Sequence, residues 1–185
     1  FRDERVAIGA NPQHVQRLRH DIKNTLDRMH SVSPMRLHPS DFTRVRLGRN
    51  CLLVQTPNCN ILVDAGMGTR EPEITREIYG LSSSKLHRNL RASNLTTRDI
   101  DVVLLSHLHL DHVGGAVRLD REGQVVPTFP NAKYLVQRAS WNEATHPNER
   151  ALPFFGLAST ALEVLGKSGQ LDYLDGDASI VPGVY

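Results

Sequence analysis

A chain of 185 residues is long enough for one domain with a core of its own. Hydrophobic residues make up 39% and charged residues 23%, a balance typical of a folded globular protein rather than a disordered one. A net charge of +2 gives no reason to expect nucleic acid as a partner. Apolar runs of only a few residues give no reason to expect a membrane-spanning segment.

The two cysteines and the first residues bear on the compartment. Cys51 and Cys59 lack metal-site spacing and are too few for a disulfide framework, so we expect reduced thiols. No leader of a basic stretch followed by an apolar one is visible, and a cytoplasmic location is the expectation. Phe1 is not an initiator methionine, which leaves open whether the natural chain starts earlier.

Residues 1–40 form an amino-terminal segment that we expect to be mainly helical and to precede a domain over 41–185. Asn11 and Pro12 suit the cap and first position of a helix. An apolar stripe then recurs at helical spacing, at Val15, Leu18, Ile22, Leu26 and Met29. The basic side chains off this stripe could meet an anionic surface, but we interpret them as the solvated face of a packed helix.

Strand patterns begin at Phe42. Residues 42–47 alternate between apolar and polar, 51–56 and 61–63 are more apolar, and Pro57 with Asn58 supplies the turn of a hairpin. Asp64 ends the last of these strands. By itself, Asp64 is explained as well by a role as a turn or cap residue as by a functional role.

Helices and strands alternate in the rest of the chain. We expect one or two helices over 71–93, with Ser82–Ser84 capping the second, then a strand at 102–105 and a polar loop that reaches a strand at 132–136. Helices over 138–145 and 159–166 and a strand at 171–174 follow. Trp141 is better explained by packing than as a platform for a substrate. This order predicts an α+β fold with two packed sheets and helices outside.

The main candidate site follows the strand at 102–105. His107, His109, Asp111 and His112 fall within six residues and precede Gly114 and Gly115. In extended chain His107 and His109 point the same way while Leu108 points inward. Imidazole and carboxylate are ordinary zinc ligands, and four of them on one loop suit two adjacent metals better than one closed structural site. We interpret the other histidines as solvated or hydrogen-bonded residues, namely His14, His20, His30, His38, His87 and His146.

The motif His-x-His-x-Asp-His followed by Gly-Gly resembles the signature of the metallo-β-lactamase-fold hydrolases. Residues 60–66, ending in Asp-Ala-Gly, are similar to an earlier strand of that family, and 126–134, 137–141, 147–150 and 175–177 are similar to its lactonase-like branch. The resemblance covers residues 42–184. It implies an αββα sandwich, of which this chain would supply the amino-terminal half to two-thirds.

The resemblance also implies roles. His107 and His109 would bind one zinc ion and Asp111 and His112 a second, with Asp111 also passing a proton to the leaving group. Asp64 would orient the metal loop by hydrogen bonds without binding metal. The implied function is hydrolysis of a small ester or lactone by a metal-bound hydroxide. Two alternatives to this function stay open: an oxygenase-type protein that binds one iron ion in the same loop, or a truncated remnant that does not catalyse a reaction.

In that family the remaining metal ligands come later in the chain: a histidine in a Gly-His turn, a bridging aspartate and a last histidine. Residues 180–184 look like the approach to the first of these, and no histidine follows His146. We therefore expect residues 1–185 alone to bind metal weakly and to be nearly inactive as an enzyme.

Overall fold

The structure, a computed structural model, describes residues 50–69 and 84–185. The expected helix within 1–40, the strand at 42–47 and the boundary between residues 40 and 41 lie outside this part, as do residues 71–83. Ser179–Tyr185 fall in a compact unit separate from Arg49–Ala178. There the amide of Ile180 donates to the carbonyl of Val184 at 2.9 Å, which closes a small turn.

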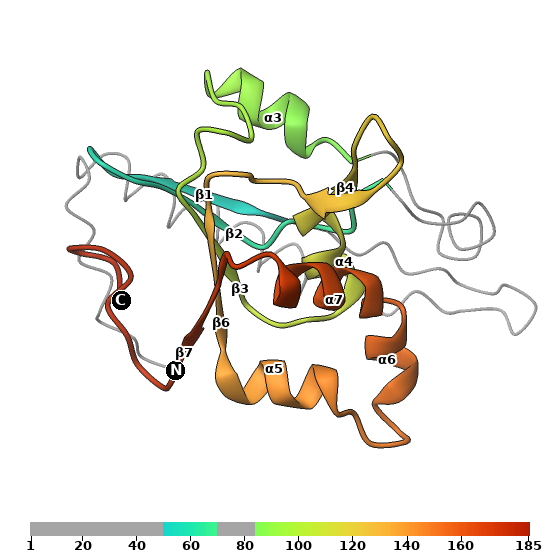
Figure 1. The fold of residues 1–185 in the computed structure, drawn as a ribbon. Coiled ribbons are helices and arrows are strands. Elements are labelled where there is room, and N and C mark those ends of the chain that lie inside the picture. Colours follow the sequence, from blue (N-terminus) through green and yellow to red (C-terminus); the bar gives the residue numbers. More distant parts are fainter. Residues whose placement is uncertain (1–49, 70–83) are drawn as a thin grey trace, which may run out of the picture. The chain divides into compact units, whose positions relative to one another are not determined.

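A five-stranded sheet of order β1-β2-β3-β6-β7 forms the centre of the unit Arg49–Ala178 (Figure 1). Its strands are β1 (Leu52–Gln55), β2 (Asn60–Val63), β3 (Val102–Leu105), β6 (Lys133–Gln137) and β7 (Leu171–Leu174). β1 and β2 are antiparallel and the other neighbours are parallel. The parallel strands bring the carboxyl ends of β2, β3 and β6 to one edge, which is where sites form in such sheets.

Short turns explain why the expected strands form where they do. In the β1–β2 hairpin the amide of Thr56 donates to the carbonyl of Cys59 at 2.9 Å, across the predicted Pro57-Asn58 turn. β3 is the apolar run 102–105, and Val103 and Leu105 are buried in it. The predicted strands at 51–56, 61–63, 102–105, 132–136 and 171–174 are therefore confirmed, with ends moved by a residue or two.

The two short strands that form the second sheet were not predicted. The sequence suggested a polar loop between Gly115 and the strand at 132–136, but β4 (Val117–Leu119) pairs with β5 (Val125–Pro127) around Arg121-Glu122-Gly123. Each strand has three residues, too few for an alternating pattern to show. The side chain of Asp120 closes the turn by accepting hydrogen bonds from the amides of Glu122 and Gln124, at 3.0 and 2.7 Å.

Helices surround these sheets in the described part of the chain. They are α3 (Leu86–Ala92), α4 (Leu110–Val113), the 3-10 turn η1 (Gly114–Ala116), α5 (Arg138–Thr145), α6 (Leu152–Gly156) and α7 (Ser159–Lys167). The predicted helices at 138–145 and 159–166 are confirmed, and the Ser84 hydroxyl accepts from the amide of Leu86 at 3.4 Å at the start of α3. In the described residues, no helix is both long and apolar enough to cross a membrane.

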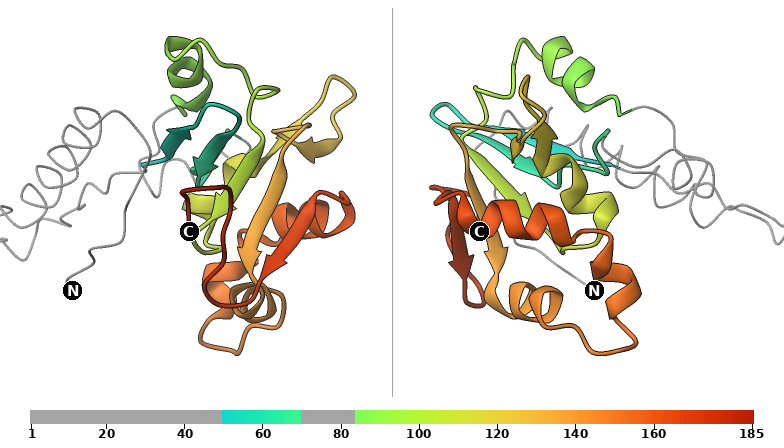
Figure 2. Two further views of the ribbon diagram at one scale, coloured as in Figure 1. Left: turned by 90° about the vertical axis from the view of Figure 1, so that its left-hand side faces the viewer. Right: turned by 45° about the vertical axis from the view of Figure 1, so that its right-hand side comes forward.

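One hydrophobic core joins both sheets. It includes Leu62 and Val103 of the large sheet, Val117 of β4 and Leu165 of α7, all nearly inaccessible to solvent. Figure 2, left, shows β4, β5 and α7 together on one side of the large sheet. The buried Tyr134 hydroxyl donates to the carbonyl of Ala116 at 3.0 Å and so ties β6 to the turn behind the metal loop. The expected two sheets with helices outside are present.

Candidate metal centre and adjoining pocket

The predicted metal loop leaves the carboxyl end of β3 and runs into α4. Leu108 is fully buried, whereas His107 and His109 on either side of it are partly exposed, as the extended chain predicts. Asp111 and His112 follow in the single turn of α4. A buried leucine thus anchors the loop, and its polar side chains face outward.

Three of the four predicted ligands converge. Ligand atoms of His107, Asp111 and His112 all lie within 4.8 Å of one another, and the rings of His107 and His112 are 3.8 Å apart between centroids. The fourth, His109, is not in this group. Its ring lies 4.7 Å from that of His107 and stacks on Phe154 at 5.7 Å with 29° between planes. Two imidazoles and a carboxylate form a donor set that fits zinc or non-haem iron.

Asp64 lies behind this group and fixes it. Its carboxylate accepts hydrogen bonds from the Ser106 amide at 2.8 Å, the Ser106 hydroxyl at 2.7 Å and the His112 Nδ1 at 2.7 Å. A carboxylate only accepts, so Nδ1 of His112 carries the hydrogen and Nε2 is left for a metal. The Asp64 residue is only 7% exposed and has a φ of 60°. This backbone conformation is uncommon outside glycine and aims the carboxylate at the loop.

Two glycines let the Asp64 loop pack directly against the metal loop. The amide of Gly115 donates to the carbonyl of Gly66 at 2.8 Å, and that of Ala65 to the carbonyl of His112 at 2.8 Å. A side chain at Gly115 would overlap the Ala65 carbonyl oxygen, and one at Gly114 would overlap that of Met67. The Gly-Gly pair is therefore required by close contact between backbones.

Electrostatics favour the form of His107 that binds metal. Burial lowers the pKa of His107, and the neighbouring imidazoles of His112 and His109 lower it further, against the opposing effect of Asp64 and Asp111. A metal binds the neutral imidazole, so a lowered pKa keeps the ligand ready at a more acidic pH.

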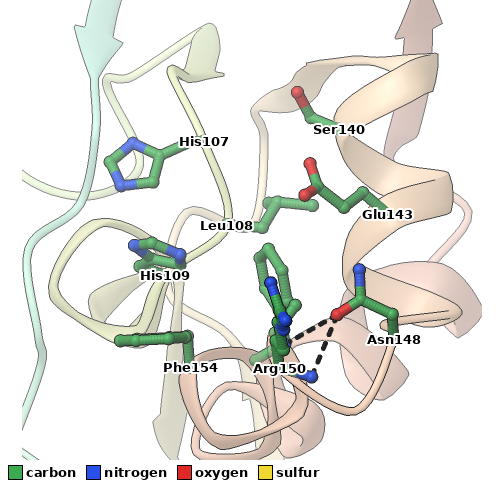
Figure 3. A pocket seen from close by; sticks show the side chains of 10 residues that line it. His107, Leu108, His109, Ser140, Glu143, Asn148, Arg150 and Phe154 are labelled. Carbon is green, nitrogen blue, oxygen red and sulfur yellow. Dashed lines mark hydrogen bonds between the residues drawn. The ribbon is translucent and has the colours of Figure 1, made fainter.

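A cavity of about 470 Å³ adjoins the loop (Figure 3). His107, Leu108 and His109 form one side, and α5, α6 and the segment between them form the other, through Ser140, Glu143, Asn148, Arg150, Ala151, Phe154 and Phe155. The sequence prediction assigned none of this second group to a site. The available signal was topological: α5 directly follows β6, which pairs in parallel with the strand that precedes the metal loop.

Comparison with known families agrees with this geometry. Residues 44–154 match the sequence model of the metallo-beta-lactamase superfamily, which is more than half of the chain. The chain therefore belongs to the metallo-beta-lactamase superfamily, and the resemblance inferred from its motifs is confirmed.

Two curated relatives differ in what their names describe. An N-acyl homoserine lactonase from Bacillus sp. is 28% identical over 147 residues, covering 72% of this chain and 50% of that protein. Transcription termination factor FttA of Methanocaldococcus jannaschii is 32% identical over 87 residues, covering 45% of this chain and 12% of that protein. The chain thus spans half of the first relative and a small part of the second.

Two solved structures share the fold. A protein described as a "probable metal-dependent hydrolase" from Staphylococcus aureus has a TM-score of 0.61 at 30% identity, over 71% of this chain and 46% of that one. AidC, described as a dizinc quorum-quenching lactonase, has a TM-score of 0.54 at 25% identity, over 71% and 45%. The predicted fold class is confirmed. AidC and the Bacillus lactonase support the lactonase-like branch.

Proposed function

We propose that this protein is a metal-dependent hydrolase of a small ester or lactone. The observation that carries the proposal is the convergence of His107, Asp111 and His112 beside a pocket of about 470 Å³. A pocket of this size suits a small molecule. The N-acyl homoserine lactonase from Bacillus sp. supports a lactone-type substrate.

The residues present fit a zinc site, and we propose that they hold two zinc ions in the natural protein, by analogy with AidC, a dizinc lactonase. Bound zinc supplies Lewis acidity and lowers the pKa of water. In our proposal His107, His109, Asp111 and His112 bind the ions, and Asp64 keeps Nε2 of His112 aimed at the site. The Asp111 side chain is 44% exposed and can pass a proton from the attacking water to the leaving group.

The charges of the pocket argue against a polyanionic substrate. Its only formally charged lining residues within the described part of the chain, apart from the histidines, are Glu143 and Arg150, whose charges cancel. A phosphate backbone needs a clear excess of positive charge. A nucleic-acid substrate, which the likeness to a transcription termination factor raises, therefore has less support than a small ester.

Zinc affinity and ester turnover are both expected to be low in residues 1–185 alone. A catalytic zinc takes three protein ligands and leaves a position for water. The described loop offers four ligands, fewer than two such ions require. We propose that this chain by itself binds zinc weakly and turns over esters slowly.

The test compares the protein encoded by the natural gene with residues 1–185, each loaded with zinc, on a small lactone, an aryl ester and a single-stranded RNA. Asp111→Asn should lower ester turnover by about 100-fold or more. Asp172→Asn, which breaks an exposed ion pair with Lys133, is the matched control and should change turnover little. RNA cleavage without ester hydrolysis would contradict the proposal. Iron with a visible absorbance in protein purified without added metal would favour the oxygenase alternative.

A further inference from the structure

The side of the pocket opposite the metal loop contains a site that the proposed chemistry does not use. In Figure 3 the Glu143 carboxylate from α5 and the Arg150 side chain from the segment before α6 both face the hollow. The apolar part of this side consists of Ala151, Phe154 and Phe155. Phe154 is 60% exposed and its ring stacks on that of His109, so it offers uncovered aromatic surface next to the metal loop.

Arg150 is held in place by a closed turn. The Asn148 Oδ1 accepts hydrogen bonds from the amides of Arg150 and Ala151, both at 3.0 Å. The Asn148 carbonyl accepts from the amides of Ala151 at 3.0 Å and Leu152 at 2.9 Å. Four hydrogen bonds to one residue fix the backbone at Arg150 and so the direction in which its side chain starts. Glu149, its neighbour in the same turn, does not line the pocket.

Within the described part of the chain, the charges of Arg150 and Glu143 have no partner and can bind a ligand. Across residues 50–69 and 84–185, neither the Arg150 guanidinium nor the Glu143 carboxylate forms a hydrogen bond or an ion pair. Some other surface charges of the described residues are paired, as Arg138 is with Asp175 at 3.0 Å and Lys167 with Glu163 at 2.6 Å. A guanidinium presents several donors in a planar fork and selects carboxylate or carbonyl oxygens.

We propose that Arg150 determines specificity by binding an oxygen of the substrate's non-reacting part, a carboxylate or a carbonyl, while the apolar segment of the substrate lies on Phe154 and Phe155. Glu143 limits the negative charge that the pocket accepts, so it selects against substrates with more than one anionic group. The inference rests on the proposed function, because the reacting ester bond is placed at the metal loop. It adds the chemical class of the substrate: an ester with an apolar chain and one further oxygen acceptor.

Three p-nitrophenyl esters with the same six-carbon acyl chain separate the contributions of charge and of hydrogen bonding. They end in a methyl group (p-nitrophenyl hexanoate), a carboxylate (mono-p-nitrophenyl adipate) or a primary amide in place of that carboxylate. The assay uses the protein encoded by the natural gene, with zinc. In Arg150→Met, kcat/KM should fall by about tenfold to a hundredfold for the adipate and less for the amide, mainly through KM. The hexanoate should change by less than about twofold. Glu143→Gln should raise kcat/KM for the adipate about twofold to fivefold.

The matched control is Glu149→Gln, which removes a charge from the same turn outside the pocket and should leave all three values unchanged. An equal loss for all three esters in Arg150→Met, or no loss, would overturn the assignment. If no ester is hydrolysed, the proposed function fails, and the pocket is then tested by binding alone. Calorimetric titration with monomethyl adipate should then show binding that Arg150→Met abolishes. Binding that is absent, or equal in both proteins, would refute the role of Arg150.

Discussion

Asp64→Asn tests how the metal loop is held. The substitution keeps the shape of the side chain, and asparagine tolerates the φ of 60° at this position, whereas alanine would add strain. The native carboxylate accepts three hydrogen bonds at 2.7–2.8 Å on two oxygens. The amide replaces one of these oxygens by a group that donates, so it cannot accept all three bonds. His112 then loses either its orientation or its partner.

The size of the effect follows from those bonds. A hydrogen bond to a charged group contributes about 1.5–3 kcal/mol, and a buried group left unsatisfied costs about 1–3 kcal/mol. We expect the metal-free protein to lose about 1–3 kcal/mol of unfolding free energy. Zinc affinity should fall by about 10–100-fold, with Asp64→Ala at least as damaging.

Zinc affinity is measured by competition with a chromophoric chelator, and stability by urea unfolding without metal. Asp101→Asn is the control, because the Asp101 carboxylate accepts one hydrogen bond from the Asn60 amide, at 2.8 Å, away from the metal loop. It should leave zinc affinity unchanged. An Asp64→Asn protein that binds zinc as the wild type does would show that Asp64 is only a turn residue.

Two further predictions concern the loop and its histidine. Gly115→Ala should destabilise the metal-free protein by about 1–3 kcal/mol or more in urea unfolding, because the new methyl overlaps the Ala65 carbonyl. The control Gly156→Ala, whose new methyl meets no atom nearby, should be close to neutral. Equal effects of the two substitutions would contradict the close packing at Gly115. His107 should titrate below the ordinary histidine pKa in NMR of the metal-free protein, since burial disfavours its charged form. Its lowered pKa means that stability is fully present above the ordinary histidine value and is lost as pH falls through the folded pKa. In His107→Gln the loss of stability at acidic pH should be smaller. An ordinary histidine pKa for His107 in the NMR titration would refute this prediction.

The sequence predicted the elements whose ends are marked by a change of pattern. β3 and β7 are apolar or alternating runs between polar turns, and α5 starts where the β6 pattern stops, so their bounds followed from local composition. The hairpin of β4 and β5 was missed because three-residue strands show no period, and its Asp120 turn resembles any polar loop.

The site divides in the same way. The close spacing of His107, His109, Asp111 and His112 suggested that all four converge. Ligand atoms of three of them lie together, and the ring of His109 stacks on Phe154 instead. The contact of His112 with Asp64 joins residues 48 positions apart, and the residue pattern left Asp64 open as a turn residue until the family resemblance was considered. Arg150 lines the same pocket as the metal loop because α5 and α6 follow β6, which pairs in parallel with β3, and no local pattern carries that information.

Whether the loop after β3 is a metal centre is tested most directly by locating the metal itself. Crystals of the protein encoded by the natural gene, loaded with zinc, would locate the ions by anomalous scattering at the zinc absorption edge. We expect a peak about 2.0–2.2 Å from ligand atoms of the group His107, Asp111 and His112, with Nε2 as the donor of His112. Zinc bound elsewhere, with these side chains turned away from any peak, would contradict a metal centre at this loop.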